Sequence, residues 1–443
     1  MSSFEAIENK MRGVGLSDAA IKAFRHSVGV LESKQSMQIP EAEISPAEGV
    51  EEWEALVAAT PEADASLLAQ AVMIKLNGGL GTSMGLQKAK SLLEIKPGVT
   101  FLDVIVRQVR SLRERAGYPV SLLLMNSFST SADTMAHLAR YAEEGFADPD
   151  KVEMIQNRVP KLQTDTLQPV EFAANPDLEW CPPGHGDLYP ALLGSGWLEK
   201  LLAAGVKYAF ISNSDNLGAQ PDTRFLRWFA ESGVPFVMEV TRRTEADKKG
   251  GHLATRKADG QPLLREIAQC PDADLADFQN IEKHRYFNTN NLWIRLDVLL
   301  DYLAANGGVL PLPVIRNVKT VDPRDAATPQ VYQLETAMGA AIQCFPGARA
   351  VCVPRSRFFP VKTCSDLLLL RSDAVQIDDA GMMSLAPECR GVAPIVQLDS
   401  KLYKLVDSLD ALGVPGLKHV TKLTVTGPYC FADGEPLSGE VTV

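Results

Sequence analysis

The sequence has few of the features that mark membrane, disulfide-bonded or zinc-binding proteins. None of its apolar runs reaches the ~18 residues that a membrane-spanning helix needs, so we expect no membrane partner. It contains seven cysteines, an odd number, and no Cys-x-x-Cys pair. Scattered cysteines predict reduced thiols and argue against a disulfide framework or a zinc site.

Positive charge is also scarce. The chain has 44 Lys and Arg against 55 Asp and Glu, which gives a formal net charge of −11 at pH 7. An acidic protein is a poor candidate for a nucleic-acid surface, and it binds polyanions only where a few cations gather or a metal intervenes. The first residues lack the basic start and the apolar core of a secretory signal, so we expect a cytoplasmic protein without nucleic-acid partners.

Glycine, in contrast, is concentrated in one short segment. Residues 75–85 read Lys-Leu-Asn-Gly-Gly-Leu-Gly-Thr-Ser-Met-Gly, and they follow the apolar run 71–74, which predicts a buried strand. A glycine-rich turn lets the backbone approach a ligand closely, and its successive N–H groups can cup an anion. Together with Lys90 downstream, this pattern predicts a phosphate site, most simply for a nucleotide. An ordinary tight turn is the alternative interpretation of such a loop taken alone.

The loop fits neither of the two commonest nucleotide motifs. No window has the two glycines, four residues apart and followed by Lys and Ser or Thr, that a P-loop needs. Gly79 and Gly81 begin a dinucleotide fingerprint, but Met84 occupies the position of its third glycine. The remaining pattern resembles the signature loop of sugar-nucleotide pyrophosphorylases, in particular that of the UTP–glucose-1-phosphate uridylyltransferase (UDPGP) family. That family has a proline where this chain has Ala89, so we expect a softer turn before Lys90.

Strand and helix signals alternate from Ala71 onward, which predicts an α/β fold. Helices then cover both faces of a Rossmann-like nucleotidyltransferase core with a mixed, mostly parallel sheet, and ligands bind at the carboxyl ends of its strands. We expect three parts, namely an N-terminal helical segment (1–70), a catalytic domain (71–386) and a small, separable β-rich domain that is β-helix-like (387–443). The further elements that we expect are strands at 119–125, 207–211, 234–240 and 349–353, a helix from 100 to 115, a helix from 131 closed by Gly145, a helix from 188 to 202, and a helix opening at 333–339.

The predicted strand 207–211 runs directly into Ser-Asn-Ser-Asp-Asn-Leu-Gly at 212–218. Proteins usually hold Mg²⁺ with one or two carboxylates and phosphate oxygens, and Asp215 at a strand end is placed for that task. The alternative is an aspartate that only caps the next turn. The resemblance to the family's Asn-x-Asp-Asn-Leu-Gly motif implies that Asp215 is the Mg²⁺ ligand and that Asn213 lies on the sugar-phosphate side.

Two further motifs point to recognition of the base and of the sugar phosphate. Residues 184–189 read Gly-His-Gly-Asp-Leu-Tyr, and Gln156 ends a predicted strand. The resemblance implies that Gly184 lies near the uracil, His185 near the sugar phosphate, and Gln156 at the uracil edge. A glutamine amide suits that edge because it offers both a donor and an acceptor. A turn histidine and a surface glutamine are the ordinary alternatives.

A third group of motifs has side chains suited to sugar hydroxyls and phosphates. Neutral amides and one carboxylate occur in 250–253, 264–269 and 287–293, and each segment alone also fits an ordinary polar loop. The resemblance implies sugar contacts from Glu266 and Asn290, and then from Asn288 and Gly251. Residues 353–363 gather three cations around an apolar stretch, where a solvated basic loop is the alternative. Their likeness to the family's Pro-Val-Lys segment implies that Lys362 contacts the phosphates of both substrates.

The resemblance implies the reversible, Mg²⁺-dependent reaction of UTP with glucose 1-phosphate to give UDP-glucose and pyrophosphate. Lys90 and Lys362 are then the catalytic cations. The nucleotide would be bound by Leu76, Asn77, Gly78, Gly79, Gly81, Thr82, Gln156 and Gly184. The alternatives are a pyrophosphorylase for another UDP-sugar, such as a UDP-N-acetylhexosamine, and a non-catalytic nucleotide-sugar sensor. We leave a homo-oligomer open, since the C-terminal β segment is short beside the family's usual β-helix.

Overall fold

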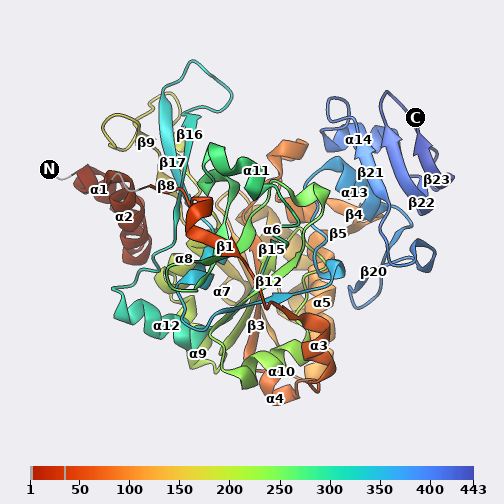
Figure 1. The fold of residues 1–443 in the computed structure, drawn as a ribbon, viewed down its shortest axis with the longest axis horizontal. Coiled ribbons are helices and arrows are strands. Elements are labelled where there is room, and N and C mark those ends of the chain that lie inside the picture. Colours follow the sequence, from red (N-terminus) through yellow and green to blue (C-terminus); the bar gives the residue numbers. More distant parts are fainter. Residues whose placement is uncertain (1–2, 34–35) are drawn as a thin grey trace.

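The computed structural model describes residues 3–33 and 36–443. Its centre is one large sheet (Figure 1), and the α/β class with a mixed, mostly parallel sheet is confirmed. Strand β15 is antiparallel to both of its neighbours, β12 and β11, while the other pairs along the main path are parallel. The order along that path is β2 (Glu51–Glu52), β18 (Arg349–Cys352), β12 (Phe236–Arg242), β15 (Tyr286–Arg295), β11 (Tyr208–Asn213), β3 (Ala71–Asn77), β6 (Ser121–Asn126) and β7 (Glu153–Ile155).

The two faces of this sheet bury different residues because successive side chains of a strand point to opposite faces. Met73 and Phe210 belong to one apolar core, and Ile74 and Ile211, their neighbours in sequence, belong to the other. Helices cover both faces, as the alternation of strands and helices predicts. The first core packs against α5 (Phe101–Ala116) and α10 (Thr223–Ser232), and the second against α8 (Leu188–Gly194), α9 (Trp197–Ala203) and α12 (Leu296–Ala305).

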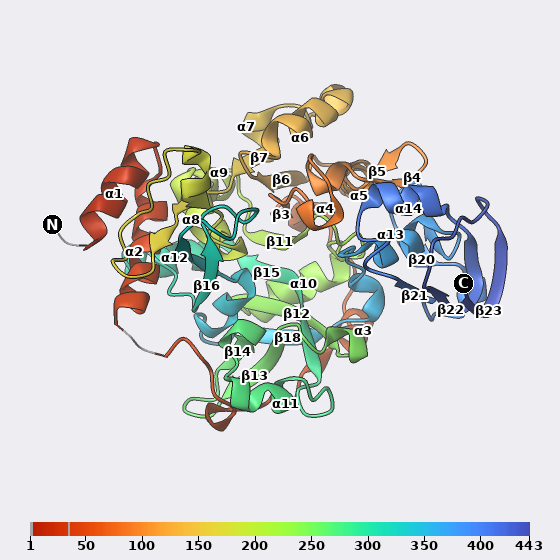
Figure 2. The same cartoon turned by 90° about the horizontal axis from the view of Figure 1, so that it is seen from above.

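The N-terminal segment, predicted to be helical, contains strands as well as helices. Helices α1 (Ser3–Gly13) and α2 (Asp18–Glu32) lie at one end of the molecule (Figure 2). They share an apolar core with the hairpin of β16 (Val314–Thr320) and β17 (Gln330–Thr336). Farther on, β2 extends the main sheet, and β1 (Ile44–Pro46) pairs with β13 (His252–Arg256), which in turn pairs with β14 (Pro262–Arg265). This segment is therefore built into the main sheet as well as into helices.

The C-terminal residues form a lobe at the opposite end of the molecule (Figures 1 and 2). Strands β21 (Ile395–Leu398), β22 (Gly416–Val425) and β23 (Pro436–Thr442) pair in parallel, the arrangement expected of a β-helix-like unit. The lobe is packed onto the main body, however, and does not form a core of its own. Its residues Val406 and Leu423 share one apolar core with α13 (Cys364–Arg371) and the main body, and Leu405 packs against Gly85 of the glycine loop.

The other expected elements agree with the structure except at two places. The capping box of Thr100 and Asp103 begins α5, and Gly145, at φ +80°, ends the turn that continues α6 (Ser131–Leu138). The predicted helix 188–202 is split into α8 and α9 around Ser195 and Gly196, and Gly196 has a left-handed backbone. The helix predicted at 333–339 is also wrong, because Gln330–Thr336 is strand and only Met338–Gln343 forms a 3₁₀ turn.

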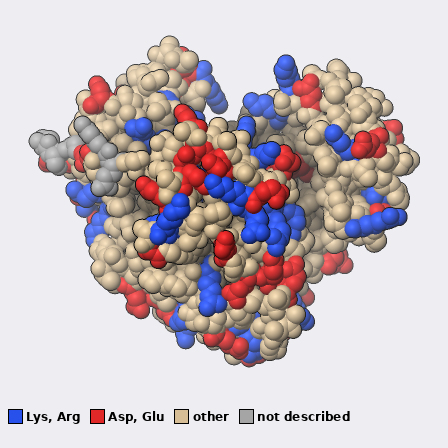
Figure 3. Space-filling model, in the orientation of Figure 1, with Lys and Arg blue, Asp and Glu red and all other residues tan. Residues whose placement is uncertain are grey.

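Acidic and basic side chains are interspersed on the face shown in Figure 3, which is hollowed between its left-hand and right-hand lobes. Within the described ranges, no helix combines the length and apolar character needed to span a membrane.

Candidate active site

The glycine loop is a compact turn at the carboxyl end of β3. Gly81 has φ +66°, a left-handed conformation that favours glycine, and a Cβ atom there would also lie 2.8 Å from Leu86 Cδ1. The backbone N–H of Lys90 donates to the carbonyl of Gly79 over 3.0 Å, which closes the loop. The hydroxyl of Ser127 donates to the carbonyl of Gly78 over 2.8 Å. The loop is thereby fixed from two sides, with Thr82 at the start of its 3₁₀ turn.

Asn77 is predicted to bind the nucleotide, but its side-chain amide is engaged inside the protein. Its side chain is buried, and its Nδ2 donates to Asn126 Oδ1 at 2.7 Å and to Thr134 Oγ1 at 3.0 Å. The amide therefore faces the protein interior and ties β3 to β6 and α6. Any contact of Asn77 with a nucleotide must come from its main chain, as is also the case for the apolar Leu76.

Lys90 reaches the turn that follows β11. Its Nζ donates to Asp215 Oδ2 over 2.8 Å and also to the carbonyl of Val361. Ala89, just before it, is buried with φ −50° and ψ +130°, a conformation that proline also adopts. Ala89 thus has a backbone conformation that is also open to the family's proline.

Asp215 can serve as one ligand of a divalent cation. Its Oδ1 is buried and has no hydrogen-bond partner in the described part of the chain, while Oδ2 receives Lys90. No cluster of three or more His, Cys, Asp and Glu suited to a metal occurs among the described residues. A single carboxylate with one free oxygen fits Mg²⁺ where phosphate oxygens supply most of the other ligands.

Gln156 and Gly184, predicted for the base, meet Gly78, which is predicted for the nucleotide, although the three come from separate segments. A Cβ atom on Gly78 would lie 2.5 Å from Gln156 Oε1, so a side chain there would displace that amide from its present position. Gln156 Nε2 donates to the carbonyl of Gly184 over 3.4 Å. Gly184 has φ +79°, and a Cβ atom there would lie 2.5 Å from the carbonyl oxygen of Thr336. Gln156, Gly78 and Gly184 form the base corner of the site, where the edge of a flat ring can lie against one side-chain amide and two glycine backbones.

The residues predicted for the sugar phosphate line one cavity of about 280 Å³, close in size to small-molecule pockets. They are His185, Asn213, Gly251, Glu266, Asn288 and Asn290, and Lys362 joins them. A Cβ atom on Gly251 would lie 2.6 Å from both oxygens of Glu266, so this glycine gives the carboxylate its space.

A bulge in β15 brings the two asparagines of this cavity together. The pairing with β12 shifts between Glu239 and Val240, which face Asn291 and Asn288, so two extra residues project from the ladder. Asn290 takes φ +58°, and Asn288 Nδ2 donates to Asn290 Oδ1 over 2.9 Å. Both amides are thereby held in fixed orientations at the cavity wall.

The protonation of the cavity's ionisable groups follows from burial. The Nδ1 of His185 accepts from the N–H of Met338 over 2.9 Å, so the Nε2 carries the proton. Burial lowers the pKa of His185 to about 4, and the ring is a neutral donor at pH 7. Burial also raises the pKa of Glu266, and the charge of Lys362 opposes this rise.

The structure separates the three cations of residues 353–363. Arg357 forms a buried bidentate pair with Glu239, and Arg355 pairs with Asp247 at 2.8 Å. Lys362 is exposed at the cavity and has no ion pair with any described residue; its Nζ lies 5.8 Å from the Phe287 ring centre. Of these three cations, only Lys362 is therefore free to meet a phosphate.

Sequence reasoning missed two supporting residues. Lys75 is fully buried, and its Nζ donates to Ser212 Oγ at 2.8 Å and to the carbonyl of Ala219 at 2.7 Å. These acceptors lie at the two ends of the turn that carries Asp215, and burial lowers the pKa of Lys75 to about 7. Glu335 is a further cavity residue. A lysine within an apolar strand was the available signal for the first, and the second lies in the segment 333–339, for which the sequence predicted a helix and no role for Glu335 itself.

Comparison with known proteins identifies the family of this chain. The family model described as UTP–glucose-1-phosphate uridylyltransferase matches residues 21–437. The chain belongs to the UTP–glucose-1-phosphate uridylyltransferase family. The enzyme of that name from Saccharomyces cerevisiae is 42% identical over 392 residues, which are 88% of this chain and 76% of the yeast one. The enzyme from Solanum tuberosum is 41% identical over 86% of this chain and 78% of its own.

Solved structures of the family superpose over the whole chain. A variant of UDP-glucose pyrophosphorylase from Leishmania major, in complex with UDP-glucose, has 48% identity and a TM-score of 0.94, covering 100% of this chain and 94% of the other. UDP-glucose phosphorylase from Trypanosoma brucei has 44% identity and a TM-score of 0.90 over 100% of both chains.

Proposed function

We propose that this chain transfers a uridylyl group from UTP to glucose 1-phosphate, giving UDP-glucose and pyrophosphate in a reversible reaction. Its membership of the uridylyltransferase family supports the reaction type. The main structural support is the single cavity in which the predicted sugar-phosphate residues meet Lys362. Asn213 extends this cavity to the end of β11, two residues before Asp215.

The chemistry requires positioning and charge neutralisation more than proton transfer. An oxygen of the sugar phosphate attacks the α-phosphorus of UTP in line, and pyrophosphate leaves on the opposite side. Because the attacking oxygen is already anionic, no general base is needed, and the two substrates must instead be held together against their repulsion. Lys362, which has no ion pair of its own among the described residues, would offset this negative charge.

The other residues would bind and orient the substrates. The loop amides near Gly79 and Gly81 would cup the β- and γ-phosphates, and Lys90 would leave Asp215 to meet them. The Nε2–H of His185 would donate to an oxygen of the sugar phosphate. Gln156 would pair with the uracil edge, and Glu266 and the asparagine pair would accept and donate to sugar hydroxyls.

We further propose Mg²⁺ as the cofactor, with Asp215 as its protein ligand. The unpartnered Oδ1 of Asp215 supports this assignment. When bound, Mg²⁺ would supply positive charge to the phosphates of both substrates. A cytoplasmic location is supported by the seven cysteines, all of them free, as expected in a reducing compartment.

The test is a panel of sugar 1-phosphates with UTP, with and without Mg²⁺. We expect pyrophosphate release and UDP-glucose formation with glucose 1-phosphate, and loss of both when the metal is chelated. Faster turnover of N-acetylhexosamine 1-phosphates would reassign the sugar. Binding of UDP-glucose without any pyrophosphate release would show a nucleotide-sugar sensor instead of an enzyme.

A further inference from the structure

Asp187 is a buried carboxylate that the proposed mechanism does not use. It is 4% exposed and forms no ion pair with any Lys or Arg of the described chain. Its Oδ2 accepts from the backbone N–H of Asn157 over 2.7 Å, and its Oδ1 accepts from Asn157 Nδ2 over 3.0 Å. A charge buried without a cation is costly, and the cost is tolerable where hydrogen bonds satisfy the group. Both hydrogen bonds of the Asp187 side chain come from a single residue, Asn157.

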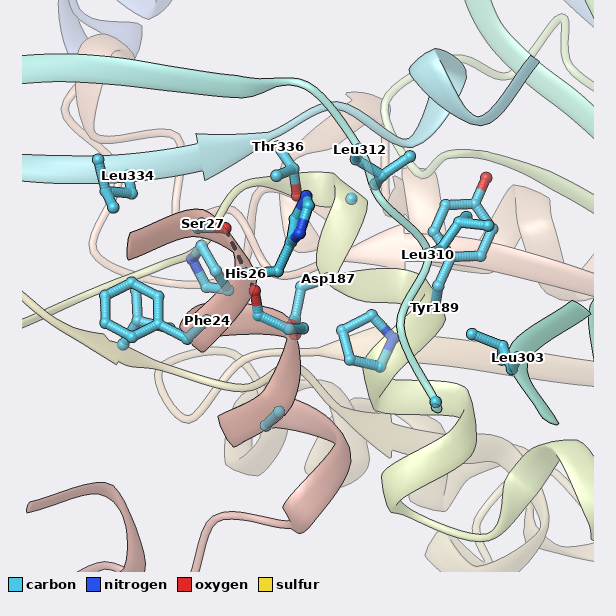
Figure 4. Close-up of a pocket in the computed structure, with 17 residues that line it drawn as sticks. Phe24, His26, Ser27, Asp187, Tyr189, Leu303, Leu310, Leu312, Leu334 and Thr336 are labelled. Atoms are coloured by element: carbon cyan, nitrogen blue, oxygen red, sulfur yellow. Dashed lines mark hydrogen bonds between the residues drawn. The ribbon is translucent and has the colours of Figure 1, made fainter. Parts of the chain in front are cut away.

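The surroundings of Asp187 fix its position. It lines a cavity of about 40 Å³ together with His26 and Ser27 of α2 (Figure 4). One residue earlier, a Cβ atom on Gly186 would lie 2.3 Å from Thr336 Oγ1, so the turn is pressed against β17. Burial raises the pKa of the Asp187 carboxyl to about 7, and the two bonds from Asn157 oppose this rise. The turn that carries Asp187 therefore packs against α2 and β17, and Asp187 itself does not line the sugar cavity.

Asn157 directly follows Gln156, whose side chain has little other support. The backbone N–H of Gln156 donates to the carbonyl of Asn126 over 2.7 Å, but its amide makes only a long 3.4 Å bond to Gly184. Strand β7 ends at Ile155 and the Gln156 N–H makes the last main-chain bond to β6, so sheet pairing does not hold Asn157. The Asp187 carboxylate replaces that pairing, because it receives both the main chain and the side chain of Asn157.

We propose that Asp187 is a positioning residue for base selection, which holds the segment 156–157 so that the Gln156 amide meets the uracil edge. The inference rests on the proposed function, in which Gln156 reads the base. Asp187 also connects the base corner with the sugar-phosphate cavity, because it bonds Asn157 and lies two residues after His185 in the same turn. A purely structural aspartate would affect stability and all nucleotides equally, whereas this role affects the choice between UTP and CTP.

The experiment compares Asp187→Asn, Gln156→Ala and the double variant in the full-length chain. The kcat/KM values for UTP and for CTP, each with glucose 1-phosphate, give a selectivity ratio for every variant. We expect Asp187→Asn to lower the ratio about tenfold, as for loss of one hydrogen bond to a charged group, mainly through KM for UTP. In the Gln156→Ala background, Asp187→Asn should not lower the selectivity ratio further, since Asp187 acts on the base only through Gln156.

An unchanged ratio in folded Asp187→Asn, or an equal loss with and without Gln156, would overturn the inference and leave the proposed function standing. A wild-type chain that releases no pyrophosphate from UTP would overturn the proposed function itself. Exposed Asp177→Asn is the matched control, expected to keep the wild-type ratio. If Asp187→Asn does not fold, Asn157→Ala removes only the 3.0 Å bond; it should lower the ratio by a smaller factor, and an unchanged ratio would overturn the inference.

Discussion

The Nζ of Lys90 lies 2.8 Å from Oδ2 of Asp215, and each residue comes from a different loop at the carboxyl edge of the sheet. The glycine loop after β3 supplies the lysine, and the turn after β11 supplies the aspartate. The predicted phosphate-binding cation is thus paired with the predicted metal-binding carboxylate. Incoming phosphates would separate the pair, because they offer the lysine a stronger anion and leave both carboxylate oxygens free for a cation.

Asp215→Ala should abolish Mg²⁺-dependent turnover while leaving the fold intact. The side chain supplies one unpartnered oxygen and one oxygen to Lys90, and it does not belong to either apolar core. We expect a loss of about 10²-fold or more in kcat, the size of effect seen when one charge-stabilising group is removed. Initial rates across a Mg²⁺ titration would measure it, and near wild-type rates with Mg²⁺ would refute the ligand assignment.

Lys362→Ala should damage turnover more than substrate affinity. A cation between two phosphate groups acts most strongly when their oxygens are closest, in the transition state, so its loss appears in kcat. We expect a loss of roughly 10²–10³-fold and only partial rescue by Lys362→Arg, because a planar fork does not replace a point charge. Arg355→Ala is the matched control, since Arg355 is already paired with Asp247. A raised KM with unchanged kcat would restrict Lys362 to binding.

Ala89→Pro should stabilise the chain without loss of activity. Ala89 has φ −50° and ψ +130°, and its N–H takes part in none of the backbone hydrogen bonds among the described residues. Proline at such a position lowers the entropy of the unfolded chain and stabilises by about 0.4–1 kcal/mol. Urea denaturation would measure the change. Because Ala89 is buried, a lower unfolding free energy would show that its neighbours do not admit the proline ring.

Lowering the pH from 7 to 5 should destabilise the chain through His185. Its pKa falls from the ordinary 6.5 to about 4 on folding, so the unfolded state binds the proton first as the pH drops. The stability contribution is therefore complete above about pH 6.5 and is lost progressively toward pH 4. Unfolding free energies at pH 7 and 5, for wild type and for His185→Asn, isolate this contribution from the other histidines. An equal pH dependence in both proteins would contradict it.

The sequence by itself determined the parts of this protein that depend on local chemistry. Apolar runs predicted β3, β6, β11, β12 and β18, because a strand buried on both faces is apolar throughout. The capping box at Thr100 predicted the start of α5, and the left-handed turn at Gly81 favours a residue without a side chain. The motif residues of the sugar phosphate could be grouped from the sequence as well, although only by resemblance to a family.

Only the tertiary structure decided which of these groups are free to act. Arg355, Arg357 and Lys362 look alike in the sequence, but Asp247 and Glu239, more than 100 residues away, occupy the first two. The same holds for the Asn77 amide, which Asn126 and Thr134 turn inward. Short strands such as β2 and the bulge in β15 also escaped prediction, because their hydrogen bonds are made to distant segments. Local sequence sets the conformation of a turn, whereas the partner of a charged or polar side chain is set by the packing of the whole chain.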